Sequence, residues 1–169
     1  MPANDDEHLG PQFTEVLPKG SVLYHVTSAE NAERIRRGGL QASEWGESGP
    51  GVYTTPDRAY AETLKSYQPG KQTFTLRTNR DLHLLDRAAP GGERHFESLA
   101  KYPAVVAPNA FEKAHANLAA AGYHGVSWRS RRSLPYEDTP TYPQPEIAIH
   151  DPSALEIQRE GETDARRRR

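Results

Sequence analysis

The sequence of 169 residues contains no cysteine. This absence excludes disulfide bonds, thiol nucleophiles, thiolate-bound zinc and iron–sulfur clusters. The sequence also has no apolar run near the roughly 18 residues that a membrane-spanning helix requires. Residues 1–7 are acidic and no apolar stretch follows them, so we expect no secretory signal. We therefore expect a cytoplasmic protein, or one delivered into the cytosol of a target cell without a signal peptide.

Neither sign of charge is in excess. The chain has 21 basic and 23 acidic residues, a net charge of −2, so no overall basic field indicates nucleic-acid binding. The seven histidines have no close ligand spacing, and we expect no metal site. The sequence contains no G-x-S-x-G elbow, no Walker loop and no H-E-x-x-H motif. These absences remove several common classes of enzyme.

The length and composition fit one domain that is rich in loops. A chain of 169 residues most simply forms one domain, and its 14 prolines and 13 glycines require many turns. Residues 1–20 are polar, and we expect a loosely ordered lead-in there. Residues 21–158 are the expected single domain. Residues 159–169 are charged, and we expect a flexible tail.

Alternation of apolar and polar residues predicts a mixed α+β fold. Strands are predicted over residues 21–26, 51–55, 72–77, 82–85, 125–128, 146–150 and 154–158. Helices are predicted over residues 31–37, 56–67, 93–102 and 110–121. The four prolines within residues 134–145 indicate an irregular loop.

The first two helices have recognisable ends. Thr27 or Ser28 is a suitable N-cap for the first helix. Pro56 suits the first turn of the second helix. In that helix we expect an inward face formed by Ala59, Tyr60 and Leu64.

Three segments carry residue types that could form an active site. The first is the strand Leu23-Tyr24-His25-Val26-Thr27-Ser28. The second is Gly49-Pro50-Gly51-Val52-Tyr53-Thr54-Thr55. The third is Ala121-Gly122-Tyr123-His124-Gly125-Val126, followed after a loop by Glu146-Ile147-Ala148-Ile149-His150-Asp151-Pro152. Taken singly, these segments are short, and each has an ordinary structural interpretation: a polar residue on a strand, a strand aromatic, and a solvated strand end.

In order and spacing, the three segments together resemble the ADP-ribosyltransferase superfamily, in its His-Tyr-Glu branch. That branch includes diphtheria-type toxins, poly(ADP-ribose) polymerase catalytic domains and small bacterial toxins. The resemblance covers residues 21–158. It implies an ADP-ribosyltransferase-like split β-sandwich: two small, mostly antiparallel sheets with flanking helices and a cleft that binds NAD⁺. Here NAD⁺ is a substrate, and no metal is needed.

The resemblance also implies roles for individual residues. His25 matches the histidine that hydrogen-bonds a ribose of NAD⁺, and the backbone of Val26, next to Thr27, would hold the carboxamide. Tyr53 matches the tyrosine that stacks on nicotinamide. Tyr60 lies near the position of a second ring-flanking residue, at a shorter offset than in some members. These five residues are the expected NAD⁺-binding set.

Glu146 matches the catalytic glutamate, so that Glu146, His25 and Tyr53 form the expected catalytic set. Cleavage of the N-glycosidic bond of NAD⁺ forms an oxocarbenium-like transition state. A carboxylate near the anomeric carbon stabilises that cation and accepts the proton of the incoming nucleophile. An aromatic face attracts the pyridinium cation.

The main functional hypothesis is a mono-ADP-ribosyltransferase toxin or effector that modifies a protein or a nucleic acid. An immunity protein or antitoxin is an expected partner, and a membrane is not. Two alternatives stay open: an NAD⁺ glycohydrolase on the same fold, and a catalytically silent module that binds nucleotide or nucleic acid. An RNA 2′-phosphotransferase shares the fold, but we cannot place the several cleft arginines that it usually needs.

Aromatic residues interleaved with arginines form a second candidate site before Glu146. Trp128-Arg129-Ser130-Arg131-Arg132, with Tyr136 and Tyr142, could grip phosphates and stack bases. The simpler interpretation is a solvated loop. His124 is interpreted as a structural turn residue, and Asp151-Pro152-Ser153 as a turn rather than part of a triad.

Overall fold

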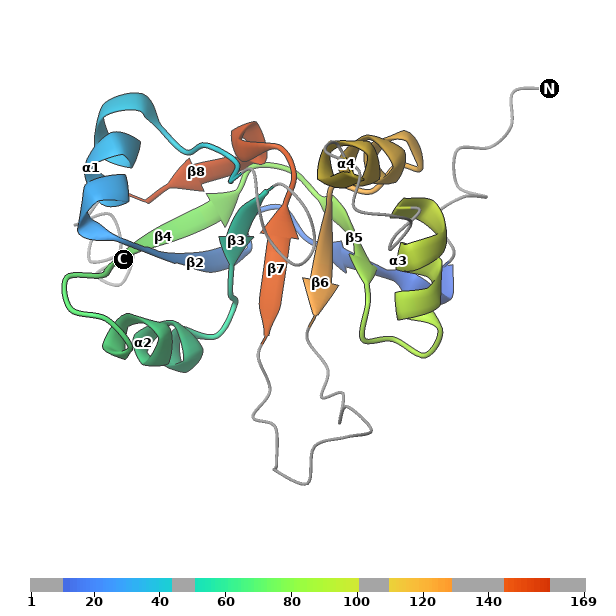
Figure 1. The fold of residues 1–169 in the computed structure, drawn as a ribbon, viewed down its shortest axis with the longest axis horizontal. Helices are drawn as coiled ribbons and strands as arrows, with labels where there is room; N and C mark the ends of the chain where they lie inside the picture. Colours follow the sequence, from blue (N-terminus) through green and yellow to red (C-terminus); the bar gives the residue numbers. More distant parts are fainter. Residues whose placement is uncertain (1–10, 44–50, 101–109, 129–144, 159–169) are drawn as a thin grey trace, which may run out of the picture.

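A computed structural model describes residues 11–43, 51–100, 110–128 and 145–158 (Figure 1). Its α-helices are α1 (Ala29–Gly38), α2 (Arg58–Ser66), α3 (Gly92–Ala100) and α4 (Ala110–Ala120), with short 3-10 helices at Pro11–Phe13 and Pro152–Ala154. Its strands are β1 (Thr14–Leu17), β2 (Val22–Thr27), β3 (Val52–Thr54), β4 (Gln72–Thr78), β5 (Leu82–Asp86), β6 (Gly125–Trp128), β7 (Glu146–Ile149) and β8 (Leu155–Ile157). The predicted mixed α+β class is confirmed.

The strands form two sheets. The larger sheet has five strands in the order β1-β5-β6-β7-β3, and the smaller has three in the order β2-β4-β8. All neighbouring strands are antiparallel except β5 and β6, which are parallel. From β1 to β5, successive strands alternate between the two sheets (Figure 1).

The main core lies between the two sheets. The smaller sheet contributes Leu23, Phe74 and Leu76, and α1 contributes Ile35. The larger sheet contributes the side chains that alternate onto one of its faces, namely Leu17, Val52, Leu82, Leu84, Ile147 and Ile149. Burial of these apolar side chains is the main force that holds the sheets together.

The opposite face of the larger sheet is partly covered by two helices. Leu85 of β5 and Val126 of β6 lie side by side in register. They pack with Phe96 of α3, Leu118 of α4 and Tyr123 in a second core cluster. The two helices leave uncovered the opposite edge of this sheet, which consists of β7 and the edge strand β3 (Figure 1).

The N-terminal boundary of the domain requires a correction. We expected residues 1–20 to be a lead-in, but residues 14–17 form β1, which pairs with β5 at the edge of the larger sheet. Only Leu17 of this strand is buried, and Val16 is 54% exposed. A four-residue edge strand with one buried side chain leaves little hydrophobic pattern in the sequence, which explains why it was missed.

The ends of the first two helices follow local chemistry. Of the two predicted N-caps, Thr27 and Ser28, it is Ser28 that caps α1, its hydroxyl accepting a hydrogen bond from the Asn31 N–H. The N-cap of α2 is Asp57, so Pro56 precedes the helix instead of lying in its first turn. The expected inward face is also shifted, because Ala61 is the buried residue of α2 and Ala59 is exposed.

Candidate functional site

Strand β3 is the point where the two sheets meet. Although β3 pairs with β7 in the larger sheet, Thr55 just beyond its end pairs with Tyr24 of β2 in the smaller sheet. The Tyr24 N–H donates to the Thr55 carbonyl over 2.8 Å, and the Thr55 N–H donates to the Tyr24 carbonyl over 2.9 Å. This bridge fixes the strand that carries His25 against the strand that carries Tyr53.

The His25 side chain is tied to the backbone of β3. Its Nδ1 lies 2.6 Å from the carbonyl oxygen of Tyr53. Because a carbonyl can only accept, Nδ1 carries the proton and Nε2 keeps the lone pair in the neutral ring. Burial lowers the pKa of His25, and the bond to Tyr53 opposes that effect only in part. The site therefore holds a neutral imidazole with a defined tautomer.

Tyr53 and Glu146 lie on the same face of the larger sheet. Tyr53 is directly opposite Ala148, and Glu146 is two residues before Ala148 on β7. Residues two apart on a strand share a face, so the two side chains are diagonal neighbours across β3 and β7. Both are half-buried. Strand β3 thus connects the three predicted catalytic residues: it carries Tyr53, its Tyr53 carbonyl binds His25, and it pairs with the strand that carries Glu146.

The other three predicted NAD⁺-binding residues lie on two neighbouring elements: Val26 and Thr27 on β2, and Tyr60 on α2. Val26 is half-buried on β2. The Thr27 hydroxyl is buried and accepts a hydrogen bond from Asn31 Nδ2 over 2.6 Å, which ties it to the start of α1. Tyr60 is half-buried in the first turn of α2, and α2 packs against β2 and β4.

A glycine of the third motif permits close approach of the strand that carries Glu146. A Cβ atom placed on Gly125 would lie 2.3 Å from the carbonyl oxygen of Ala148, so no larger residue fits without a shift. The glycine in the Gly-Tyr-His-Gly-Val segment is therefore a packing requirement of the β6–β7 pair.

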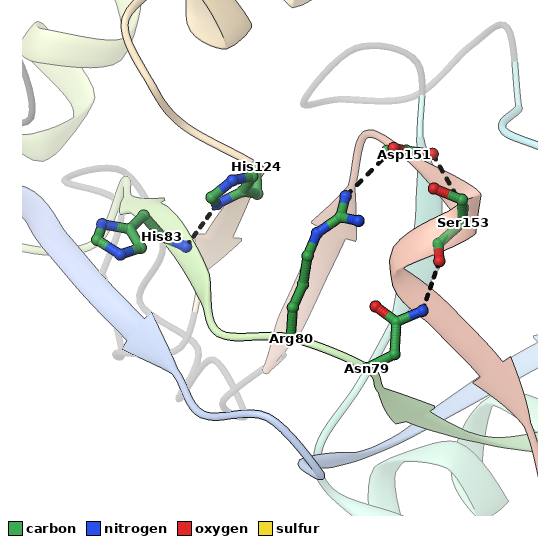
Figure 2. Close-up of polar contacts among 6 residues, drawn as sticks. All are labelled: Asn79, Arg80, His83, His124, Asp151 and Ser153. Atoms are coloured by element: carbon green, nitrogen blue, oxygen red, sulfur yellow. Dashed lines mark hydrogen bonds and ion pairs between the residues drawn. The ribbon is translucent and has the colours of Figure 1, made fainter. Parts of the chain in front are cut away.

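A second polar cluster lies at the opposite end of the same sheet (Figure 2). Arg80 pairs with Asp151 over 3.2 Å, and Asp151 caps the 3-10 helix by accepting from the Ser153 N–H. The His83 N–H donates to His124 Nδ1 over 2.9 Å. These contacts confirm the interpretation of His124 and Asp151 as structural residues, because their side chains accept backbone hydrogen bonds at turns.

Sequence reasoning missed two residues that the structure connects to this region, Asp57 and Arg87. Asp57, which caps α2, was not recognised, nor was Arg87, which contacts Trp128. An Asp two residues after a strand and just before a helical pattern is a usable capping signal. No local signal joins Arg87 to Trp128, because they are distant in sequence.

Several expected features fall outside the described residues. They are Arg129, Ser130, Arg131, Arg132, Tyr136 and Tyr142 of the second candidate site. Within residues 11–43, 51–100, 110–128 and 145–158, no group of three or more His, Asp or Glu side chains is arranged to hold a metal ion. Of the helices in this part of the chain, none is both long enough and apolar enough to cross a membrane.

Comparison with known proteins gives a distant likeness to a solved structure. No protein-family model matches the sequence, and no curated protein matches it significantly. The chain is similar to a chain in the crystal structure of the M. tuberculosis MbcT–MbcA toxin–antitoxin complex, at 13% identity and a TM-score of 0.47. The match covers 92% of this chain and 89% of that one. Values this low support no inference about activity.

Proposed function

We propose that this protein is an ADP-ribosyltransferase that cleaves NAD⁺ and transfers ADP-ribose to a macromolecule with release of nicotinamide. The observation that carries the proposal is the anchoring of His25 Nδ1 to the Tyr53 carbonyl at 2.6 Å, beside a face that Tyr53 shares with Glu146. A neutral imidazole, an aromatic ring and a carboxylate are the three groups that the reaction uses. Their resemblance to the His-Tyr-Glu pattern supports the same conclusion.

The proposed reaction replaces one bond at the anomeric carbon of the nicotinamide ribose. The bond from that carbon to the nicotinamide nitrogen breaks, and its electron pair leaves with neutral nicotinamide. A nucleophilic atom of the acceptor forms the new bond to the same carbon, and its proton passes to the Glu146 carboxylate and then to water. No oxidant or reductant is required.

Glu146 has two tasks in this reaction. As an anion, it stabilises the positive charge that develops on the ribose. As a base, it takes the proton of the acceptor, a contribution worth about 10²–10⁴ in rate. Its place at the first residue of β7 leaves it half-buried at the end of a strand, where a carboxylate can meet both a substrate and solvent.

His25 and Tyr53 are proposed to hold the nicotinamide half of NAD⁺. The Tyr53 ring attracts the pyridinium cation by about 0.5–2 kcal/mol. Since His25 donates from Nδ1 to the Tyr53 carbonyl, Nε2 is its acceptor for a ribose hydroxyl. Val26, Thr27 and Tyr60 complete the proposed binding set around these two residues.

The deciding experiment measures nicotinamide release from NAD⁺ by the purified chain and by Glu146→Ala. Each is assayed alone, with cell extract, and with extract treated with nuclease or with protease. Release that requires extract, is lost in Glu146→Ala and disappears after one of the treatments supports a transferase and identifies its acceptor class. Fast release by the chain alone, unchanged by extract, would instead make water the acceptor. A folded chain that releases no nicotinamide under any condition contradicts the proposal.

The proposal includes a role as a toxin or effector that an antitoxin or immunity protein restrains. Uncontrolled modification of a macromolecule, with consumption of NAD⁺, should arrest the growth of a cell that expresses the active chain. We expect induced expression to stop bacterial growth and Glu146→Ala to relieve the arrest at equal protein levels. Normal growth with the active chain would argue against this role and leave the enzymatic proposal to the assay above.

A further inference from the structure

An arginine outside the proposed catalytic set is held rigidly near Glu146. Arg87 follows directly after β5, and its guanidinium donates two hydrogen bonds to Glu93 of α3, from Nε over 2.8 Å and from Nη2 over 2.7 Å. The two side chains are only 13% and 21% exposed. A paired, two-bond contact between a planar guanidinium and a carboxylate fixes orientation as well as distance.

The same guanidinium contacts two aromatic rings. Its central carbon lies 4.2 Å from the ring centre of Phe96 and 4.6 Å from the ring centre of Trp128. Phe96 is 3% exposed and belongs to the second core cluster. Arg87 therefore connects the packed helix α3 to the aromatic residue at the end of β6. Both contacts are cation–π interactions, which strengthen when water is excluded.

Trp128 is the direct cross-strand neighbour of Glu146. The register of β6 and β7 places these two residues opposite each other, with their side chains on the same face of the sheet. Trp128 is the last residue of β6 and Glu146 is the first of β7, so this pair closes the β6–β7 ladder. The end of a ladder opens more easily than its middle. The orientation of Glu146 thus depends on what holds Trp128.

The backbone reinforces the same link. The Arg87 N–H donates to the Ser127 carbonyl over 3.0 Å, one residue before Trp128. Stability alone does not require a largely buried ion pair here, because apolar residues often replace such pairs with little loss of stability. A planar and directional contact does, however, fix the ring of Trp128 in one orientation.

We propose that Arg87 is a positioning residue, which holds the Trp128 indole so that Trp128 orients Glu146 for the reaction. This inference rests on the proposed function, because it concerns the same carboxylate. Displacement of a reacting group by about 1 Å can cost around 10²-fold in rate. Since His25 and Tyr53 are proposed to hold NAD⁺, loss of the Arg87 contact should lower kcat and change the KM for NAD⁺ little.

The variants separate position from charge and from folding. Arg87→Met combined with Glu93→Gln removes both charges together, which avoids leaving one charge buried alone. Arg87→Lys keeps the charge but loses the planar contact. Trp128→Phe keeps an aromatic ring at the end of β6.

A matched control is available on the exposed side of α1. Arg34 pairs with Glu30 over 2.9 Å, and both side chains are exposed. Arg34→Met combined with Glu30→Gln removes the same two charges as the test variant. This control should leave kcat unchanged.

Fluorescence tests the contact without relying on activity. The chain has two tryptophans, Trp45 and Trp128, so in a Trp45→Phe background all tryptophan emission comes from Trp128. The Arg87→Met/Glu93→Gln variant should increase acrylamide quenching of Trp128 and decrease its anisotropy. Arg34→Met/Glu30→Gln should change neither. A thermal unfolding curve confirms that each variant is folded.

Kinetics then test the positioning role. We expect kcat for nicotinamide release to fall about 10- to 100-fold in Arg87→Met/Glu93→Gln. The KM for NAD⁺ of this double variant should stay within about twofold of the wild-type value. Trp128→Ala should lower kcat as well, and Trp128→Phe should keep most of the kcat that Trp128→Ala loses. Arg87→Lys, which keeps only the charge, should fall between the wild type and the double variant.

The outcomes distinguish this inference from the function on which it rests. An active wild type with unchanged kcat in the folded double variant overturns the positioning role alone. Unchanged quenching and anisotropy of Trp128 in the double variant also overturn it, whatever the activity. A wild type that releases no nicotinamide overturns the proposed function and the kinetic part of this inference together.

Discussion

The two ends of β7 carry similar kinds of polar residue in different arrangements. At one end, Glu146 begins the strand beside Trp128 and diagonally from Tyr53. At the other end, the chain leaves the strand through His150 and Asp151, and Asp151 pairs with Arg80 and caps the next turn (Figure 2). Both ends contain a carboxylate and at least one histidine.

The difference lies in what the polar groups do for the backbone. At the Asp151 end, Asp151 accepts from the Ser153 N–H, Asn79 donates to the Ser153 carbonyl over 2.6 Å, and His124 accepts from the His83 N–H. Each contact fixes a turn. At the Glu146 end, the histidine is fixed in one tautomer, and an aromatic ring and a carboxylate share a face. A polar cluster therefore indicates a reactive site only when its groups match a chemical task.

Exchange of one carboxylate for an amide at each end of β7 is the strongest test of this comparison. Glu146→Gln removes the charge and the proposed base, so nicotinamide release should fall by about 10²–10⁴. Asp151→Asn should leave nicotinamide release unchanged and lower the melting temperature, because the carboxylate hydrogen bonds and the Arg80 ion pair are weakened. Steady-state assays and thermal unfolding of both variants measure the two effects.

The pH dependence of the Asp151 contribution has a defined sign. Hydrogen bonds from Ser153, followed by the nearby Arg80, hold the pKa of Asp151 below its usual value. The carboxylate therefore stabilises the fold above its unfolded pKa, and this contribution is lost as the pH falls through the folded pKa. A large loss of nicotinamide release in Asp151→Asn, in which Glu146 is intact, would contradict the purely structural role assigned to the Asp151 end of β7.

Replacement of the Tyr53 ring should have the next largest effect. Tyr53→Leu removes the proposed cation–π contact, worth about 0.5–2 kcal/mol, which corresponds to about 2- to 30-fold in the KM for NAD⁺. Tyr53→Phe keeps the ring face and should retain most of the affinity. The measurement is the KM for NAD⁺ of the wild type, of Tyr53→Phe and of Tyr53→Leu. Equal losses in Phe and Leu would assign the effect to the hydroxyl instead of the ring.

The His25 tautomer predicts a smaller effect. In His25→Asn, the amide nitrogen can still donate to the Tyr53 carbonyl, but the acceptor at Nε2 is lost. Loss of one neutral hydrogen bond of about 1 kcal/mol should raise the KM for NAD⁺ about fivefold. A binding isotherm for NAD⁺ on wild type and variant checks this. Unchanged affinity would mean that Nε2 does not contact the substrate.

The part of this arrangement that could be predicted from sequence is the part with local signals. Alternation located β2, β3 and β7, and the Ser28 hydroxyl located the start of α1. These signals lie within a few residues of the structure that they predict. The α+β class followed from them.

The missed parts depend on contacts between distant segments. Strand β1 is recognisable only because β5 pairs with it, and its single buried residue gives no pattern. The link from Glu93 through Arg87 to Trp128 joins α3, the end of β5 and the end of β6. Trp128 was singled out for its neighbours in sequence, whereas the structure relates it to Glu146 across the sheet.

The smallest expected effect concerns acid stability at the Asp151 end of β7. Burial, followed by electrostatic repulsion from His83 and Arg80, lowers the pKa of His124, while Asp151 opposes the shift. His124 Nδ1 accepts the His83 N–H, so protonation there breaks the bond (Figure 2). The unfolded chain takes up this proton more readily. The contribution of His124 to stability is therefore complete above about pH 6.5 and is lost as the pH falls below it.

His124→Asn should reduce this acid sensitivity, because an amide oxygen can accept the His83 N–H and does not titrate in this range. The measurement is the change in melting temperature between about pH 7.5 and about pH 5.5, on either side of the ordinary histidine pKa. Wild type should lose more than His124→Asn. Some loss should persist in the variant, because burial also lowers the pKa of His25 and of His95. An equal fall in melting temperature in both proteins would show that protonation of His124 does not limit acid stability.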